Sequence, residues 1–151
     1  MTSFSQLRQR RHRAWLLEAH NDLALAQLAK DNGLLAQSCY VASQTAEKGL
    51  KGALVGLGVE PPHAQVLNDL VQRLGDNGLN TDQLETLPLR ALSRMAIQSR
   101  YPLDATPPSE LFDPADAEQA LSTAAEVLNI LESLDQQHCS DQPPKWSDWT
   151  P

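Results

Sequence analysis

The chain has 151 residues, of which 41% are hydrophobic and only 5% aromatic. This length predicts a single domain with one hydrophobic core, and the composition favours a helical bundle over a β-sandwich. The net charge of −7 argues against a generally basic, nucleic-acid-binding surface. No apolar run approaches the roughly 18 residues of a membrane span, and the first residues lack the apolar core of a signal peptide. We therefore expect a cytoplasmic protein.

The first predicted helix covers residues 5–30 and ends at Asn32-Gly33. Its start carries a cluster of four arginines without an intervening acid: Arg8, Arg10, Arg11 and Arg13. The helix macrodipole disfavours cations near a helix N-terminus. These arginines are therefore either frayed and solvated or part of an anion-binding site.

The second predicted helix covers residues 34–57 and ends at Gly58. Small residues recur along one of its faces at helical spacing: Ala42, Ala46, Gly49 and Ala53. Gly49 and Gly52 each cost roughly 1 kcal/mol in a helix relative to alanine, so we expect them to permit close contact with another helix. This stripe is also compatible with contact between two copies of the chain.

A different face of the same helix carries Gln44, Lys48 and Lys51, and Glu47 stands four residues before Lys51. Residues at this spacing lie beside one another on a helix surface, so Glu47 and Lys51 can form an ion pair. The face is then either a solvated surface with one weak ion pair or a cationic, hydrogen-bonding edge that faces a cleft.

Shorter elements are predicted for the middle of the chain. A third helix covers residues 64–74, and Gly75 to Gly78 form a turn. Helical periodicity continues across Pro88 from 81 to 99, which predicts a kinked or two-part element. Prolines at 102, 107 and 108 predict a loop over 102–112.

The last predicted helix has the clearest start, with Asp113 as the N-cap and Pro114 at the first helical position. Its buried stripe is predicted to consist of Ala117, Leu121, Ala124, Leu128 and Leu131. The sequence therefore predicts an all-α, antiparallel up-and-down bundle of about five helices over residues 1–134. A polar tail that contains Trp146 and Trp149 is predicted over residues 135–151.

The segment from Gln44 to Lys51 resembles the Q-x-A-x-K-x-x-K run of the HEPN domain family, small helical domains found with nucleotidyltransferases and in toxin–antitoxin pairs. Three further segments resemble, in the same order along the chain, the first helix, the loop and the R-Y-P corner of that family: residues 19–26, 58–62 and 99–102. The resemblance extends over residues 15–134. It implies a HEPN-like bundle that forms a homodimer.

Many HEPN proteins are metal-independent ribonucleases with an R-x4-H-x-Y motif. Arg94 and Tyr101 match this motif, but Ser99 stands where the histidine belongs. A serine hydroxyl does not exchange a proton near pH 7 without a neighbouring base. Arg13 and His20 share a looser R-x6-H spacing that recurs by chance. We therefore expect no catalytic residue, and no cysteine or histidine spacing indicates a metal site or a cofactor.

The residues that could form a nucleotide or anion site combine cations with hydrogen-bonding and stacking groups: Gln44, Lys48, Lys51, Arg94, Arg100 and Tyr101. Arginine binds phosphate with two parallel hydrogen bonds, and lysine acts as a point charge. The alternative is that Arg94 and Arg100 form structural ion pairs with acids such as Glu47 or Asp104.

The resemblance implies a non-enzymatic module that binds a nucleotide or a nucleic acid such as RNA. Such a module acts with a separately encoded minimal nucleotidyltransferase in a pair of the toxin–antitoxin kind. Two other functions stay open at this point. One is a ribonuclease toxin in which Arg94 or Arg100 works with a histidine outside the motif, and the other is a dimeric scaffold without a ligand.

Overall fold

The computed structural model describes residues 3–63 and 66–141, with side chains up to residue 135. Within this part of the chain every regular element is an α-helix: α1 (Phe4–Asp31), α2 (Leu35–Gly56), α3 (Leu67–Asp76), α4 (Asp82–Glu85), α5 (Leu89–Gln98), α6 (Pro108–Leu111) and α7 (Pro114–Asp141). None of these described helices is both long enough and apolar enough to cross a membrane.

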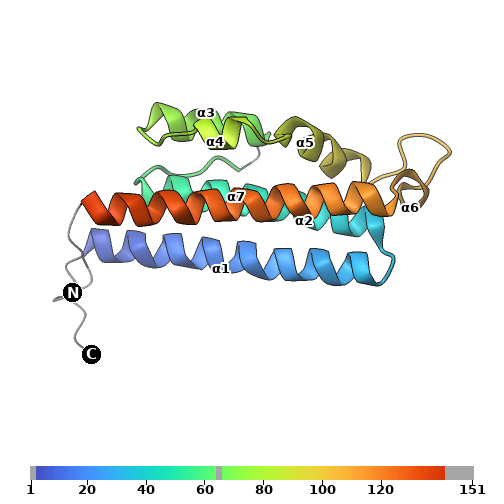
Figure 1. The fold of residues 1–151 in the computed structure, drawn as a ribbon, viewed down its shortest axis with the longest axis horizontal. Coiled ribbons are helices and arrows are strands. Elements are labelled where there is room, and N and C mark those ends of the chain that lie inside the picture. Colours follow the sequence, from blue (N-terminus) through green and yellow to red (C-terminus); the bar gives the residue numbers. More distant parts are fainter. Residues whose placement is uncertain (1–2, 64–65, 142–151) are drawn as a thin grey trace.

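The helices are arranged in layers around α2 (Figure 1), which contacts α1, α3, α5, α6 and α7. The helix α1 forms one edge of the bundle, and α3, α4 and α5 together form the opposite edge. The chain therefore runs up and down through four columns, with the third column broken into three short helices. The predicted all-α up-and-down bundle is confirmed, although the number of helices rises because α4 and α6 are separate single turns.

The boundaries of α1 and α2 are set by local sequence. Ser3 and Gln6 form a reciprocal capping box, so α1 begins as a regular helix at Phe4, and the four early arginines lie exposed along its first turns. The turn after α1 places Gly33 at φ 75°, and the turn after α2 places Gly58 at φ 82°. Only glycine adopts such angles without steric cost, which explains both helix ends.

The small-residue face of α2 is used for packing within the chain. A Cβ atom at Gly52 would lie 2.7 Å from the Trp15 Cβ of α1, and one at Gly49 would lie 2.7 Å from Leu128 Cδ2 of α7. The Ser38 hydroxyl donates a buried hydrogen bond of 2.8 Å to the carbonyl of Ala26 in α1. Because α1 and α7 cover this face, it is not the surface on which a second copy would dock.

The start of α7 follows the prediction. The backbone N–H of Asp116 donates to Asp113 Oδ1 at 2.8 Å, the N–H of Asp113 donates to Asp116 Oδ2 at 3.0 Å, and all five residues of the predicted stripe are buried. The predicted loop before it was wrong in one place, because Pro108 starts the single turn of α6 with a backbone angle suited to a first helical position. The helix α7 continues to Asp141, and Trp146 and Trp149 lie outside the described residues.

Candidate functional site

The first predicted site cation, Lys48, is held by the neighbouring helix. Its Nζ atom lies 2.6 Å from Asp22 Oδ2 of α1, and the two side chains are only 31% and 18% exposed. In a half-buried ion pair of this kind, each charge compensates the other in a region from which water is largely excluded. Lys48 therefore ties α1 to α2, and its positive charge is already balanced in the folded chain.

Lys51 is also occupied by contacts within the chain. The residue is 7% exposed, its Nζ atom donates a hydrogen bond of 2.9 Å to the carbonyl oxygen of His63, and it lies 3.4 Å from Glu47 Oε1. The predicted pairing of Glu47 with Lys51 is thus confirmed. These contacts fasten the segment that follows α2 onto the body of that helix.

Arg100 has a different environment from the two lysines. Its guanidinium carbon lies 5.3 Å from the ring centroid of Tyr40 and 5.4 Å from that of Tyr101, so both rings are within the range of cation–π attraction. Tyr40 is half-buried on α2, whereas Tyr101 is 61% exposed in the segment after α5. The three residues form a surface cluster, here named the Arg100 cluster.

The other two predicted site residues lie on the helices that adjoin this cluster, α2 and α5. Gln44 is half-buried on α2, one turn after Tyr40 and on the same face of the helix. Arg94 is exposed on α5, and among the described residues neither Arg94 nor Arg100 forms an ion pair. In particular, Glu47 pairs with Lys51, and Asp104 accepts a hydrogen bond from the Thr106 backbone N–H.

Sequence reasoning missed Tyr40, although a signal was available. Tyr40 stands four residues before Gln44 and thus extends the predicted polar face of α2 by one turn. Its contact with Arg100 depends on how α5 packs against α2, which no local pattern reveals. Of the six predicted residues, the structure therefore holds the two lysines in contacts within the chain and brings Arg100 and Tyr101 together with Tyr40.

The position that corresponds to the motif histidine carries no acid–base group. Ser99 is the C-cap of α5, and its hydroxyl donates a long hydrogen bond of 3.4 Å to the carbonyl of Ala96 in the same helix. The described histidines of α1 contact other elements: His12 Nδ1 lies 2.8 Å from the carbonyl of Gly52, and His20 pairs with Glu132 of α7. Both histidines therefore bond to elements other than α5.

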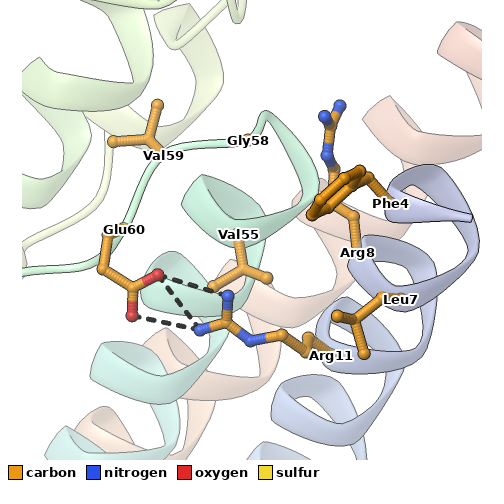
Figure 2. Close-up of a pocket in the computed structure, with 8 residues that line it drawn as sticks. All are labelled: Phe4, Leu7, Arg8, Arg11, Val55, Gly58, Val59 and Glu60. Atoms are coloured by element: carbon orange, nitrogen blue, oxygen red, sulfur yellow. Dashed lines mark hydrogen bonds and ion pairs between the residues drawn. The ribbon is translucent and has the colours of Figure 1, made fainter.

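Two of the early arginines, Arg8 and Arg11, line a hollow of about 170 Å³ between the start of α1 and the end of α2 (Figure 2). Within it, Arg11 forms a bidentate ion pair with Glu60, with an Nη2–Oε1 distance of 3.1 Å. Figure 2 shows the Arg8 side chain directed away from this pair. The Arg11 charge is thus neutralised by a carboxylate of the same chain, which makes this hollow a poor anion site.

This protein is a helical bundle with a cationic aromatic surface. The helical columns, the motif segments on α2 and α5 and the Arg100 cluster define this class. Residues 12–134 match the HEPN domain family, and the chain belongs to that family. The predicted resemblance is confirmed.

Two solved structures are similar to this chain. The crystal structure of TT1696 from Thermus thermophilus is 31% identical, covers 82% of this chain and 98% of its own, and gives a TM-score of 0.73. ST0689, described as an archaeal HEPN homologue, is 24% identical over 82% of this chain and 96% of its own, with a TM-score of 0.62, and shows the shared fold. No curated protein sequence matches this chain.

Proposed function

We propose that this HEPN domain is a non-enzymatic module that binds a nucleotide or a single-stranded nucleic acid at the Arg100 cluster. The observation that carries the proposal is the guanidinium of Arg100 placed beside the rings of Tyr40 and Tyr101 without an acidic partner among the described residues. An arginine that stacks on aromatic rings keeps donors in the plane of its guanidinium, and these suit phosphate oxygens.

The aromatic rings provide contacts for the base of the ligand, in addition to the phosphate contacts of Arg100. Tyr101 is largely exposed, so one face of its ring can stack on a base, and such stacking is tolerant of base identity. Gln44 adds a hydrogen-bonding side chain one turn along α2, and Arg94 adds a second exposed cation on α5. Because Ser99 offers no group that exchanges a proton near neutral pH, the arrangement favours binding over ribonuclease cleavage.

The experiment is a thermal-stability screen of the pure chain with ATP, GTP, CTP, UTP and a short RNA. A ligand at about 100 times its dissociation constant adds roughly 2.7 kcal/mol to the free energy of unfolding, which gives a readable shift in melting temperature. We expect the Arg100→Ala variant to lose the shift. Arg90→Ala removes another exposed arginine of α5 and is the matched control.

The partner part of the proposal rests on the family alone: the module acts with a separately encoded minimal nucleotidyltransferase, as in toxin–antitoxin pairs. Co-expression with a nucleotidyltransferase encoded beside this chain should yield a complex that survives purification. A flat ligand screen for both the wild type and the complex would overturn the nucleotide-binding proposal, whereas failure to form a complex would overturn only the partnership.

A further inference from the structure

The hollow between the start of α1 and the end of α2 has apolar side chains in both of its walls. Figure 2 shows Phe4 and Leu7 of α1 on one side, and Val55 and Val59 on the side of α2 and the segment after it. Phe4 is 90% exposed and Leu7 is 49% exposed. Apolar surface of this kind gains free energy when another apolar group covers it. The hollow is therefore suited to an occupant with a large apolar side chain.

The hollow also has a cation in its lining, Arg8, which forms no ion pair among the described residues. Its guanidinium lies against the turn after α2, where a Cβ atom added to Gly58 would be 3.3 Å from Arg8 Cζ. The neighbouring Arg11, in contrast, is held by Glu60. An occupant that carries a carboxylate close to its apolar group would thus satisfy both the apolar walls and Arg8.

The helix α7 ends at the same end of the bundle as this hollow (Figure 1). His20 of α1 pairs with Glu132 of α7. Nearer the start of α1, His12 Nε2 lies 3.8 Å from Asp135 Oδ2. Residue numbers therefore fall along α1 as they rise along α7. From Asp135 the helix has six further residues, about 9 Å of its axis, so it ends at Asp141 beside the first turns of α1.

The sequence that follows α7 contains the groups that the hollow requires. Residues 142–151 lie outside the described part of the chain, and their sequence includes Trp146, Trp149 and one acid, Asp148. Trp146 stands five residues after Asp141, and five residues of extended chain span about 17 Å. This reach exceeds the diameter of one helix, which is about 10 to 12 Å. Trp146 can therefore reach the hollow from the end of α7.

We propose that the hollow binds residues 142–151 of the same chain, with the Trp146 ring between the apolar walls and the Asp148 carboxylate paired with Arg8. A tryptophan side chain buries roughly 150 to 250 Å² in such a contact. Because a short tether gives an effective concentration on the order of a millimolar, a contact with a dissociation constant of about 0.1 mM is occupied in about nine of ten chains.

The bound segment shields the apolar and cationic start of α1 from other molecules. The hollow adjoins the end of α2, whereas Tyr40 of the Arg100 cluster lies near the start of that helix. The inference is thus independent of the proposed function, and either can fail without the other.

The first measurement is fluorine NMR of the full chain with fluorotryptophan at every tryptophan position. Variants with phenylalanine in place of Trp146 or Trp149 assign the resonances. A synthetic peptide of residues 142–151 gives the positions of these resonances in the absence of the bundle. We expect the Trp146 resonance of the full chain to lie away from its position in the peptide, because the ring contacts the side chains of the hollow.

The Phe4→Ala/Arg8→Ala variant then removes two exposed side chains of the hollow. We expect it to lower the ratio of bound to free segment by at least about tenfold, so that the Trp146 resonance moves towards its position in the peptide. Arg10→Ala/Leu17→Ala removes one exposed arginine and one exposed apolar residue of the same helix outside the hollow, and is the matched control. We expect no movement in this control.

The Asp148→Asn variant tests the proposed ion pair. We expect it to lower the ratio of bound to free segment by about twofold to fivefold, and we expect high salt to remove this difference. The same substitution should have no further effect once Arg8 is replaced by alanine. An equal effect with and without Arg8 would overturn the pairing of Asp148 with Arg8.

Two results would overturn the proposal as a whole. One is a Trp146 resonance that coincides with that of the peptide in the unaltered chain, and the other is a resonance that the Phe4→Ala/Arg8→Ala variant leaves in place. A Trp146 resonance that reaches the bound position only as the protein concentration rises would identify another copy's segment as the occupant. That outcome would overturn binding within one chain.

Discussion

The two halves of α2 carry different polar residues and meet different surroundings: the charged side chains lie in the C-terminal half, and the N-terminal half has uncharged ones. In the C-terminal half, Lys48 pairs with Asp22, and Lys51 is fixed by the carbonyl of His63. In the N-terminal half, Tyr40 lies against an exposed arginine that has no acidic partner among the described residues. One half of the helix thus uses its polar residues to hold the fold, and the other leaves them accessible. The difference depends on the residues that neighbouring elements bring to each half, and the sequence of α2 alone does not show it.

Close packing in the C-terminal half gives the largest expected effect. At Gly52 a Cβ atom would lie 2.7 Å from Trp15 Cβ, an atom fixed to the α1 backbone. We expect Gly52→Ala to lower the free energy of unfolding by about 2 kcal/mol, because overpacking exceeds the gain in helix propensity. Urea denaturation measures the change.

Gly49→Ala is the comparison for that measurement. Its added Cβ would meet Leu128 Cδ2 and Leu131 Cδ1, which are the ends of flexible side chains and can shift. We expect a smaller loss than at Gly52. Equal losses at the two glycines would show that the α1–α2 contact is no tighter than the α2–α7 contact.

Loss of the ion pair between Lys48 and Asp22 is expected to have the next largest effect on the free energy of unfolding. Lys48→Ala leaves the Asp22 carboxylate, which is only 18% exposed, without its partner. We expect a loss of about 1 to 2 kcal/mol in the free energy of unfolding. In the double variant Lys48→Ala/Asp22→Asn, the unpaired carboxylate charge is also removed, which should restore part of that stability. If Lys48→Ala instead abolishes nucleotide binding without a loss of stability, Lys48 belongs to the accessible half of α2.

Local signals in the sequence were sufficient for the helix boundaries that depend on local chemistry. Asp113 and Pro114 mark the start of α7 because a cap and a preset backbone angle act within one turn. Asn32-Gly33 marks the end of α1 for the same reason. The single turn of α6 was missed because the prolines around it indicate a loop as readily as a first helical turn.

The candidate site was less predictable because its contacts join different elements. The sequence predicted the bond between Glu47 and Lys51, which lie one turn apart, but not the pairing of Lys48 with Asp22 on another helix. The contact of Arg100 with Tyr40 likewise depends on the packing of α5 on α2. The family resemblance indicated which lysines and arginines belong to the candidate site. It could not show which of these charges are already neutralised by an acidic residue of the same chain.

The smallest expected effect on the free energy of unfolding comes from Cys39, on the inner face of the N-terminal half of α2. This effect depends on pH. Burial, together with the negative charges of Asp116 and Asp113, raises the pKa of the Cys39 thiol from 9.0 to about 11. The unfolded chain therefore releases this proton at a lower pH than the folded chain does. The stability that the neutral thiol contributes is complete below pH 9 and is lost as the pH rises towards 11.

We expect the free energy of unfolding to fall by about 1 kcal/mol between pH 8 and pH 10 because of this group alone. Urea denaturation at several pH values measures the fall, and the Cys39→Ala variant, which lacks the thiol, provides the background from all other groups. The difference between the two proteins should shrink with rising pH. A constant difference would mean that Cys39 ionises as readily in the fold as in the unfolded chain, and that the inner face of this half of α2 is open to water as well.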